Sequence, residues 1–270
     1  MLLMLRLKER KAPRKNKYPS KPPHPYARLM EPGGSEIHYR SFLDQFNLNT
    51  QMEFDHSLYA VLSNLAEGIR LNGAMREWLL RKSTSALIND SVIHAFHEVE
   101  ARYYLEKFKE SHDPVYAISA ADEFNQAVQY EVAVSILNEY SHIKQNSNAK
   151  IGAFYLLTLG TSLYELGLYV DAREATLESY RKSKEEIATC LLLGKVCLHL
   201  TDVYQSIFWF TEAENNGCDR KECDDVMRQA LKSVRFAQRH AVVRQLFNID
   251  AERYRFARAV LPKKRRSALI

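Results

Sequence analysis

The chain has 270 residues, of which 46% are hydrophobic and 26% are charged, with only 8 prolines and 9 glycines. This length allows one large domain or two, and the shortage of helix-breaking residues favours an all-helical protein with a substantial core. No apolar run approaches the roughly 20 residues that a membrane-spanning helix requires, so we expect no membrane span.

The net charge of +5 combines two basic ends with an acidic middle. Residues 1–28 carry a charge of +8, residues 220–270 carry +9, and residues 29–219 carry −12. An asymmetry of this size indicates an acidic or phosphorylated partner for the two ends. The alternative is that the basic ends bind the protein's own acidic middle.

The amino-terminal segment, residues 1–39, contains most of the prolines and many of the basic residues. This composition predicts an extended basic arm that cannot form a core. Its first dozen residues, MLLMLRLKERKA, are also compatible with a mitochondrial presequence, although serine is absent before Ser20. We expect an intracellular protein, in the mitochondrion or the cytoplasm, with reduced cysteines.

Apolar residues recur at helical spacing from residue 40 to about residue 261, and no alternating strand pattern is present. We expect a helical extension over residues 40–113, with Asp55 capping one helix and Asp90 or Ser91 capping another. Asp113–Pro114 should end that helix and start the next, because proline suits the first helical turn.

The stretch Leu159–Ala172, LGTSLYELGLYVDA, contains two glycines within a helical pattern, and part of it recurs. Gly160 and Gly194 lie 34 residues apart, and the residues around them align. Two helices per 34 residues are typical of tetratricopeptide repeats, and this chain resembles that family. A degenerate copy precedes the two clear ones, so the repeats cover residues 114–218, followed by basic capping helices over 219–261 and a basic tail over 262–270.

This resemblance implies an all-α, TPR-like solenoid of antiparallel helix pairs. Small residues at Gly160 and Ala172 let the two helices of a hairpin approach closely, and Gly167 ends the first helix in a left-handed turn. In the second clear copy, Thr201 stands at the position of that turn glycine. Gly160 and Gly167 are therefore predicted to serve helix packing and the hairpin turn, and not to bind a phosphate.

The first helices of such a stack line a groove, which we predict to bind a protein segment. The predicted groove residues are Phe154, Leu157, Thr161, Tyr164, Leu191, Lys195 and Leu198. A clamp for a peptide's terminal carboxylate is disfavoured, because Leu157, Thr161 and Ala188 replace polar groups that it needs. The alternative is that this face packs against the chain's own amino-terminal helices or arm.

No pattern in the sequence predicts catalysis, a cofactor or a small-molecule substrate. His94, His97 and Glu98 lie close together on one predicted helix, but their spacing matches no zinc-protease pattern and lacks a third ligand. Cys218 and Cys223 likewise have no second pair that would complete a zinc site. We therefore expect a non-enzymatic protein without a metal.

The basic carboxyl-terminal region predicts contacts with RNA or an acidic protein surface, positional rather than base-reading. Arg228, Lys232, Arg235 and Arg239 recur at the spacing of one helix face. The further candidates are Arg253, Arg255, Arg258, Lys263, Lys264, Arg265 and Arg266. The alternative is a solvated face on a capping helix.

These features together predict a scaffold or adaptor subunit of a large assembly, with a protein partner in the groove and an acidic partner at the basic ends. An organellar ribosome or another mitochondrial complex fits the arm, and a ciliary or microtubule assembly fits it equally. A soluble regulatory adaptor that binds one peptide reversibly is the second hypothesis, and a helical RNA-binding protein is the third.

Overall fold

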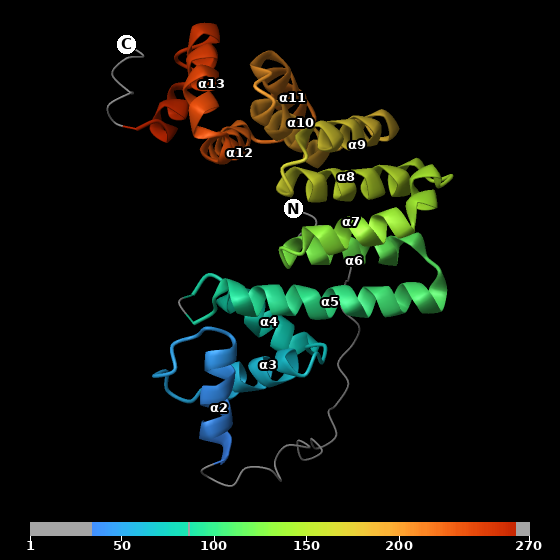
Figure 1. Cartoon of the computed structure of the whole chain (residues 1–270), viewed down its shortest axis with the longest axis vertical. Helices are drawn as coiled ribbons and strands as arrows, with labels where there is room; N and C mark the ends of the chain where they lie inside the picture. Colours follow the sequence, from blue (N-terminus) through green and yellow to red (C-terminus); the bar gives the residue numbers. More distant parts are fainter. Residues whose placement is uncertain (1–33, 86, 263–270) are drawn as a thin grey trace, which may run out of the picture.

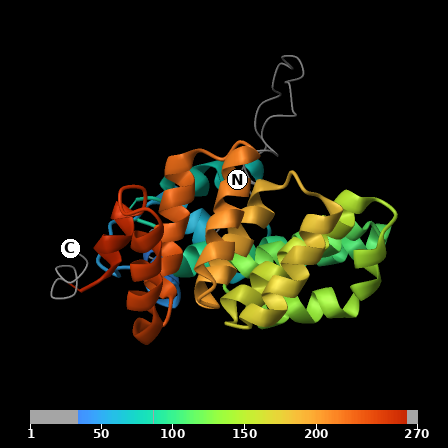
Figure 2. The same cartoon turned by 90° about the horizontal axis from the view of Figure 1, so that it is seen from above.

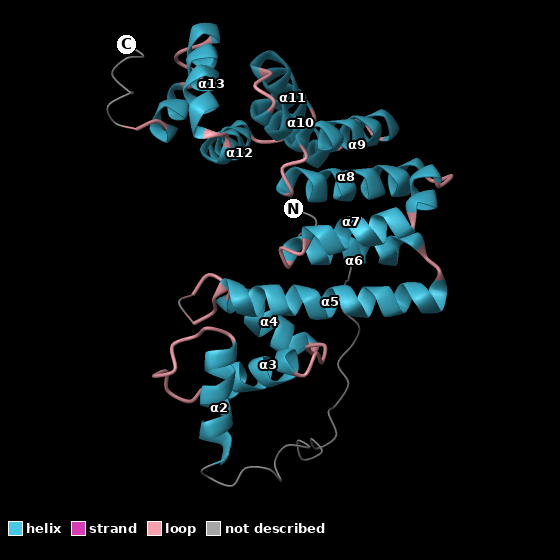
Figure 3. Cartoon of the chain, in the orientation of Figure 1, coloured by secondary structure: helices cyan, strands magenta, loops and turns pink. Residues whose placement is uncertain are grey.

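The computed structural model describes residues 34–85 and 87–262, and this part of the chain is helical and contains no strand (Figure 1 and Figure 3). The predicted all-α class is therefore confirmed, and the helices pack in adjacent pairs. In chain order they are α2 (Gly34–Gln45), α3 (His56–Ala66), α4 (Gly73–Lys82), α5 (Asp90–Ser111), α6 (Pro114–Gln126), α7 (Tyr130–Glu139), α8 (Ala149–Glu165), α9 (Tyr169–Lys182), α10 (Ile187–His199), α11 (Val203–Asn215), α12 (Arg220–Ser233) and α13 (Phe236–Ile249), with 3₁₀ segments η2 (Ser141–Gln145) and η3 (Arg255–Val260).

Helix α2 begins at Gly34, inside the segment for which the sequence predicted an extended arm. The predicted boundary at residue 39 is therefore wrong. The helix starts earlier because Tyr39, Leu43 and Phe46, at helical spacing, are all buried against α3 and the loop that precedes it. The remainder of the predicted arm, residues 1–33, lies outside the described residues.

Helix α5 belongs to two cores at once. Its first half, with Val92 and Phe96, packs on α2–α4, and its second half, with Phe108, packs on α6 and α7. Its N-cap is Asn89, whose side chain accepts a hydrogen bond from the Val92 amide, so the predicted caps Asp90 and Ser91 are wrong by one or two positions. A single long helix thus joins the amino-terminal helices to the rest of the molecule.

A buried ion pair fastens this junction. The Glu100 carboxylate is almost completely buried, and the Arg70 guanidinium donates two hydrogen bonds of 2.9 Å to its two oxygens. Arg76 lies 3.3 Å from the same carboxylate. Because an unpaired buried charge is costly, Glu100 holds the loop before α4 and the start of α4 against α5.

Three hairpins, α6–α7, α8–α9 and α10–α11, follow α5 and lie one upon another (Figure 1). The first helix of each hairpin also contacts the first helix of the next, from α6 to α8, from α8 to α10 and from α10 to α12. Helix α12 contacts α10 and α11, and Figure 2, seen from above, shows α12 and α13 set to one side of the α6–α7 hairpin.

Gly160 and Gly194 lie at equivalent points of two successive hairpins, as the repeat predicted. Each is buried in a first helix and faces the second helix of its own hairpin. A Cβ atom at Gly160 would overlap the Thr176 hydroxyl, and one at Gly194 would lie 2.7 Å from the Phe210 ring. Only a residue without a side chain allows these helices to approach so closely.

The three hairpin turns share one backbone geometry. Val128, Gly167 and Thr201 all have positive φ, of 61°, 77° and 62°. In each turn this residue's amide bonds to the carbonyl three residues earlier, and the next amide bonds to the carbonyl five residues before it. This pair of bonds defines the Schellman motif at a helix end, for which glycine is the preferred residue. The predicted turn position of Thr201 is confirmed.

We expect Thr201→Gly to stabilise the protein by about 0.5–1 kcal/mol, because a β-branched residue is strained at positive φ. Urea unfolding monitored by circular dichroism measures this change. The matched control is Thr211→Gly within α11, which should lose stability because glycine is a poor helix former. Equal losses in the two variants would contradict the strained turn.

Gly160→Ala should destabilise the protein by about 1–3 kcal/mol, because the added methyl group overlaps Thr176. Thr176→Ala removes the overlapping hydroxyl, so the double variant should be more stable than the two single losses predict. Gly73→Ala is the control, since its added carbon would meet open space. A Gly160→Ala variant as stable as Gly73→Ala would refute the close helix approach.

Candidate binding surfaces

The seven predicted groove residues lie on two neighbouring first helices, α8 and α10. Leu157, Tyr164 and Leu198 are buried, so they cannot line an open groove. Phe154, Thr161, Leu191 and Lys195 are half-buried and lie on α8 and α10, the two first helices for which the repeat predicted a groove. We call these four residues the first-helix strip.

Close stacking of the hairpins explains this burial. Leu157 and Tyr164 from α8 form a small core with Leu192 and Val196 from α10. Leu198 belongs to the next core, which extends to α12 and α13. A repeat pattern identifies the helix face on which a residue lies. Whether that face is buried depends on how closely the next hairpin packs against it.

Three polar side chains, of which Tyr164 and His199 are buried and Ser233 is exposed, join successive first helices. The Tyr164 hydroxyl lies 3.0 Å from His199 Nε2, and Ser233 Oγ lies 3.1 Å from the same nitrogen. The Tyr169 ring stacks on His199 with its centroid at 4.3 Å. Sequence reasoning missed this cluster, although Tyr164 and His199 are one residue more than a repeat length apart.

Burial sets the charge state of the cluster. It lowers the pKa of His199 to about 4, with a further contribution from the charge of Lys195, and it raises the pKa of Tyr164 to about 12. At neutral pH the imidazole and the phenol are therefore both uncharged. Tyr164 can donate its hydrogen bond to His199, which suits an internal tie between α8, α10 and α12.

A serine beside a histidine raises the question of a nucleophile. The Ser233 hydroxyl, however, donates to the Ala230 carbonyl at 2.8 Å, and His199 Nε2 is shared with Tyr164. In the part of the chain that the structure describes, no carboxylate contacts the His199 ring to orient it. Nucleophilic catalysis needs a base that is oriented and free to accept the proton, and this arrangement lacks both properties.

Lys195 gives the strip its only charge. Its Nζ atom lies 4.2 Å from the centroid of the Tyr164 ring and 3.9 Å from Glu165 Oε1. Burial lowers the pKa of Lys195, and the nearby Glu165 carboxylate opposes this effect. The strip therefore presents apolar surface with one cation beside one exposed carboxylate.

The predicted basic stripe on a single helix is wrong. Helix α12 ends at Ser233, and Val234 and Arg235 are extended before α13 begins at Phe236. The Arg239 guanidinium turns back and donates to the Lys232 and Val234 carbonyls, which caps the end of α12. The helix breaks here because Val234 is buried in the core and fixes the turn of the chain.

Other predicted basic residues also have structural partners. Arg228 pairs with Asp225 and lies 5.2 Å from the centroid of the Phe256 ring, and Arg253 pairs with Glu214. The exposed members of the predicted set are Lys232, Arg235 and Arg255, while Arg258 is half-buried. Lys263, Lys264, Arg265 and Arg266 lie outside the described residues.

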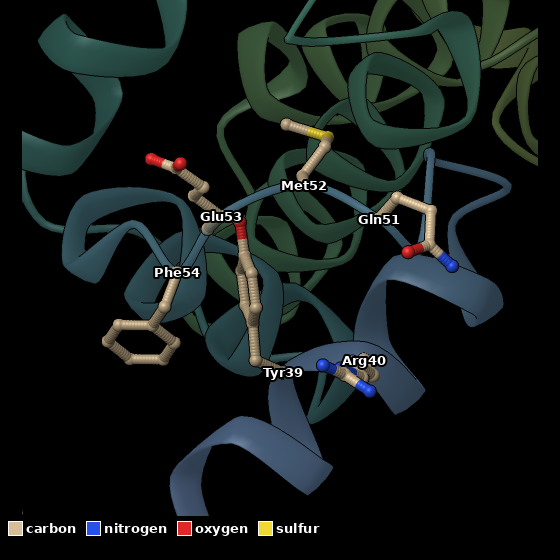
Figure 4. A pocket seen from close by; sticks show the side chains of 6 residues that line it. All are labelled: Tyr39, Arg40, Gln51, Met52, Glu53 and Phe54. Carbon is tan, nitrogen blue, oxygen red and sulfur yellow. Dashed lines mark hydrogen bonds between the residues drawn. The ribbon is translucent and has the colours of Figure 1, made fainter.

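A hollow of about 280 Å³ lies far from both surfaces, between α2 and the loop before α3 (Figure 4). Tyr39, Arg40, Gln51, Met52, Glu53 and Phe54 line it. The Tyr39 hydroxyl donates to the Glu53 carbonyl at 3.2 Å, and its ring meets Phe54 edge to face. These contacts join the loop to α2.

The histidines and cysteines that the sequence raised as metal ligands do not converge. His97 Nδ1 lies 2.7 Å from Glu123 Oε2, which links α5 to α6. The four cysteines are free and buried. Among the described residues, no three histidine, cysteine or acidic side chains gather closely enough to hold a metal ion.

No family model, curated protein or solved structure matches this chain. The resemblance to tetratricopeptide repeats therefore depends on the repeated positions alone. Within the described ranges, no helix combines the length and the apolarity that crossing a bilayer requires.

We expect acidification to destabilise the protein through His199. Its pKa is about 4 when folded and 6.5 in the unfolded chain, so the unfolded chain binds the proton more readily below pH 6.5. The free energy of unfolding should fall by about 1 kcal/mol from pH 7 to pH 5.5 on this account. Urea unfolding measures the free energy of unfolding at both pH values. In His199→Gln, its fall between pH 7 and pH 5.5 should be smaller by about 1 kcal/mol than in the unmodified protein. An equal fall in the two proteins would contradict a buried neutral imidazole.

Proposed function

We propose that the protein is a non-enzymatic scaffold or adaptor, built on a TPR-like solenoid. One observation carries the proposal: three successive hairpins have the same left-handed turn, and two of them have the same helical glycine. Repeated hairpins of this kind produce an extended surface on which other chains bind, and their stability comes from contacts between neighbouring repeats.

The first-helix strip is the surface that we assign to a protein partner. It is narrow, since Leu157, Tyr164 and Leu198 are covered by packing. What it offers is apolar contact from Phe154 and Leu191 and, one turn after Leu191 on α10, the ammonium group of Lys195. Such a surface suits an apolar segment with an acceptor group that meets the lysine.

The second surface is basic and lies at the junction of α12 and α13. Lys232 and Arg235 are both exposed there, and Arg255 is exposed on η3. These side chains suit an acidic protein surface or the phosphates of RNA. A subunit that uses both surfaces fits a large intracellular assembly, such as an organellar ribosome or a microtubule-associated complex, in the mitochondrion or the cytoplasm.

Two pairs of substitutions should separate the two surfaces when the tagged full-length chain is purified with its partners from cells. Lys232→Glu with Arg235→Glu should reduce, by about tenfold, the partners that dissociate at high salt. Thr161→Lys with Leu191→Lys should instead remove partners that resist salt, because it obstructs the strip. Quantitative mass spectrometry of the bound proteins measures both effects.

The control for the basic pair is Lys107→Glu with Lys109→Glu on α5, which makes the same change of charge elsewhere. Circular dichroism verifies that each variant is folded. The unmodified protein is also purified after treatment with ribonuclease. If this treatment alone removes the salt-sensitive partners, RNA holds them to the protein. If neither pair changes the bound partners relative to the control, both assignments fail.

A further inference from the structure

Exposed apolar side chains gather at the hairpin turns. Six of the twelve large apolar side chains that are exposed in the described residues lie in the three turns or in the helix that follows each turn. They are Val128, Val132, Leu168, Val170, Tyr204 and Phe208. We call the three segments that hold them, residues 128–135, 167–174 and 201–208, the turn edge.

The repeat aligns these segments in space. Val170 and Tyr204 are 34 residues apart and occupy the same position of successive hairpins, with exposed fractions of 52% and 73%. In Figure 1 the α6–α7 and α8–α9 turns lie at the same end of the stack. A soluble chain rarely leaves large apolar side chains repeated along one edge unless something covers them.

The turn edge is also acidic. It contains the carboxylates of Glu131, Asp171, Glu174 and Asp202 but one basic residue, Arg173, which gives a net charge of −3. Glu131, Asp171 and Glu174 are exposed. The surface therefore suits an occupant that is both apolar and basic, and it disfavours an acidic partner.

The chain itself contains such a segment. Residues 1–11, MLLMLRLKERK, combine six leucines and methionines with four basic residues and one acid, a net charge of +3. We propose that residues 1–11 bind the turn edge of the same molecule, placing their apolar side chains on those of α7, α9 and α11 and their basic groups beside Glu131, Asp171 and Glu174.

The connection is long enough for this contact. Residues 12–33 separate the segment from α2, and twenty-two residues span up to about 70 Å when extended. From α2 the turn edge is reached across layers of helices that pack about 10 Å apart, or roughly 50 Å for five layers. The contact explains why a strongly basic segment and an acidic, apolar edge occur in one chain.

Photo-crosslinking of the full-length chain tests this proposal. Benzoylphenylalanine at position 5, in place of Leu5, should form crosslinks to residues 128–135, 167–174 and 201–208, mapped by mass spectrometry. Glu131→Lys with Glu174→Lys should reduce these crosslinks at least fivefold, and so should 0.5 M salt. Glu139→Lys with Glu185→Lys, which reverses two exposed carboxylates away from the turn edge, should leave them unchanged.

Mixing unlabelled and ¹⁵N-labelled chains before irradiation distinguishes contacts within a molecule from contacts between two. Crosslinks confined to chains of one label support the proposal. Mixed-label crosslinks would place a second copy on the edge, and crosslinks elsewhere, or none at all, would also overturn the proposal. Binding of an acidic partner at the junction of α12 and α13 does not depend on this result. The proposed function and the proposed contact of residues 1–11 can therefore fail separately.

Discussion

The absence of a side chain at two helical positions determines how this protein packs. At Gly160 and Gly194 the second helix of a hairpin comes so close to the first that even a methyl group would collide with it. At Gly194 a buried hydroxyl reinforces this close approach. The Ser206 hydroxyl of α11 donates a hydrogen bond of 2.9 Å to the Gly194 carbonyl of α10. Each glycine lowers helix propensity by roughly 1 kcal/mol, and the close packing offsets that loss.

The close approach within each hairpin affects the surfaces of the whole stack. The first helices of successive hairpins contact one another, and this contact buries Tyr164 and His199. What remains accessible is the first-helix strip, where the sequence predicted a groove. The turns then project as a repeated edge with apolar and acidic side chains. At the other end, α5 and its buried Glu100 connect the stack to the amino-terminal helices. Packing thus determines which faces remain for a partner.

The sequence predicted the helices and the equivalence of Gly160 and Gly194, because helical periodicity and a 34-residue repeat are local features. It also placed Thr201 in a turn. It did not predict the break after Ser233, since neither glycine nor proline marks that point and the burial of Val234 decides it. The burial of Leu198 was missed for a related reason, because it depends on contacts with later helices rather than on its own hairpin.

The most direct test of the central claim is the nuclear Overhauser effect between the Gly194 α-protons and the ring protons of Phe210 in solution. Strong effects are expected for this pair, with the glycine α-protons shifted by the ring current, and corresponding effects are expected between Gly160 and Thr176. If both glycines instead show effects only to residues of their own helix, the second helices do not pack there, and the repeated hairpins are wrong.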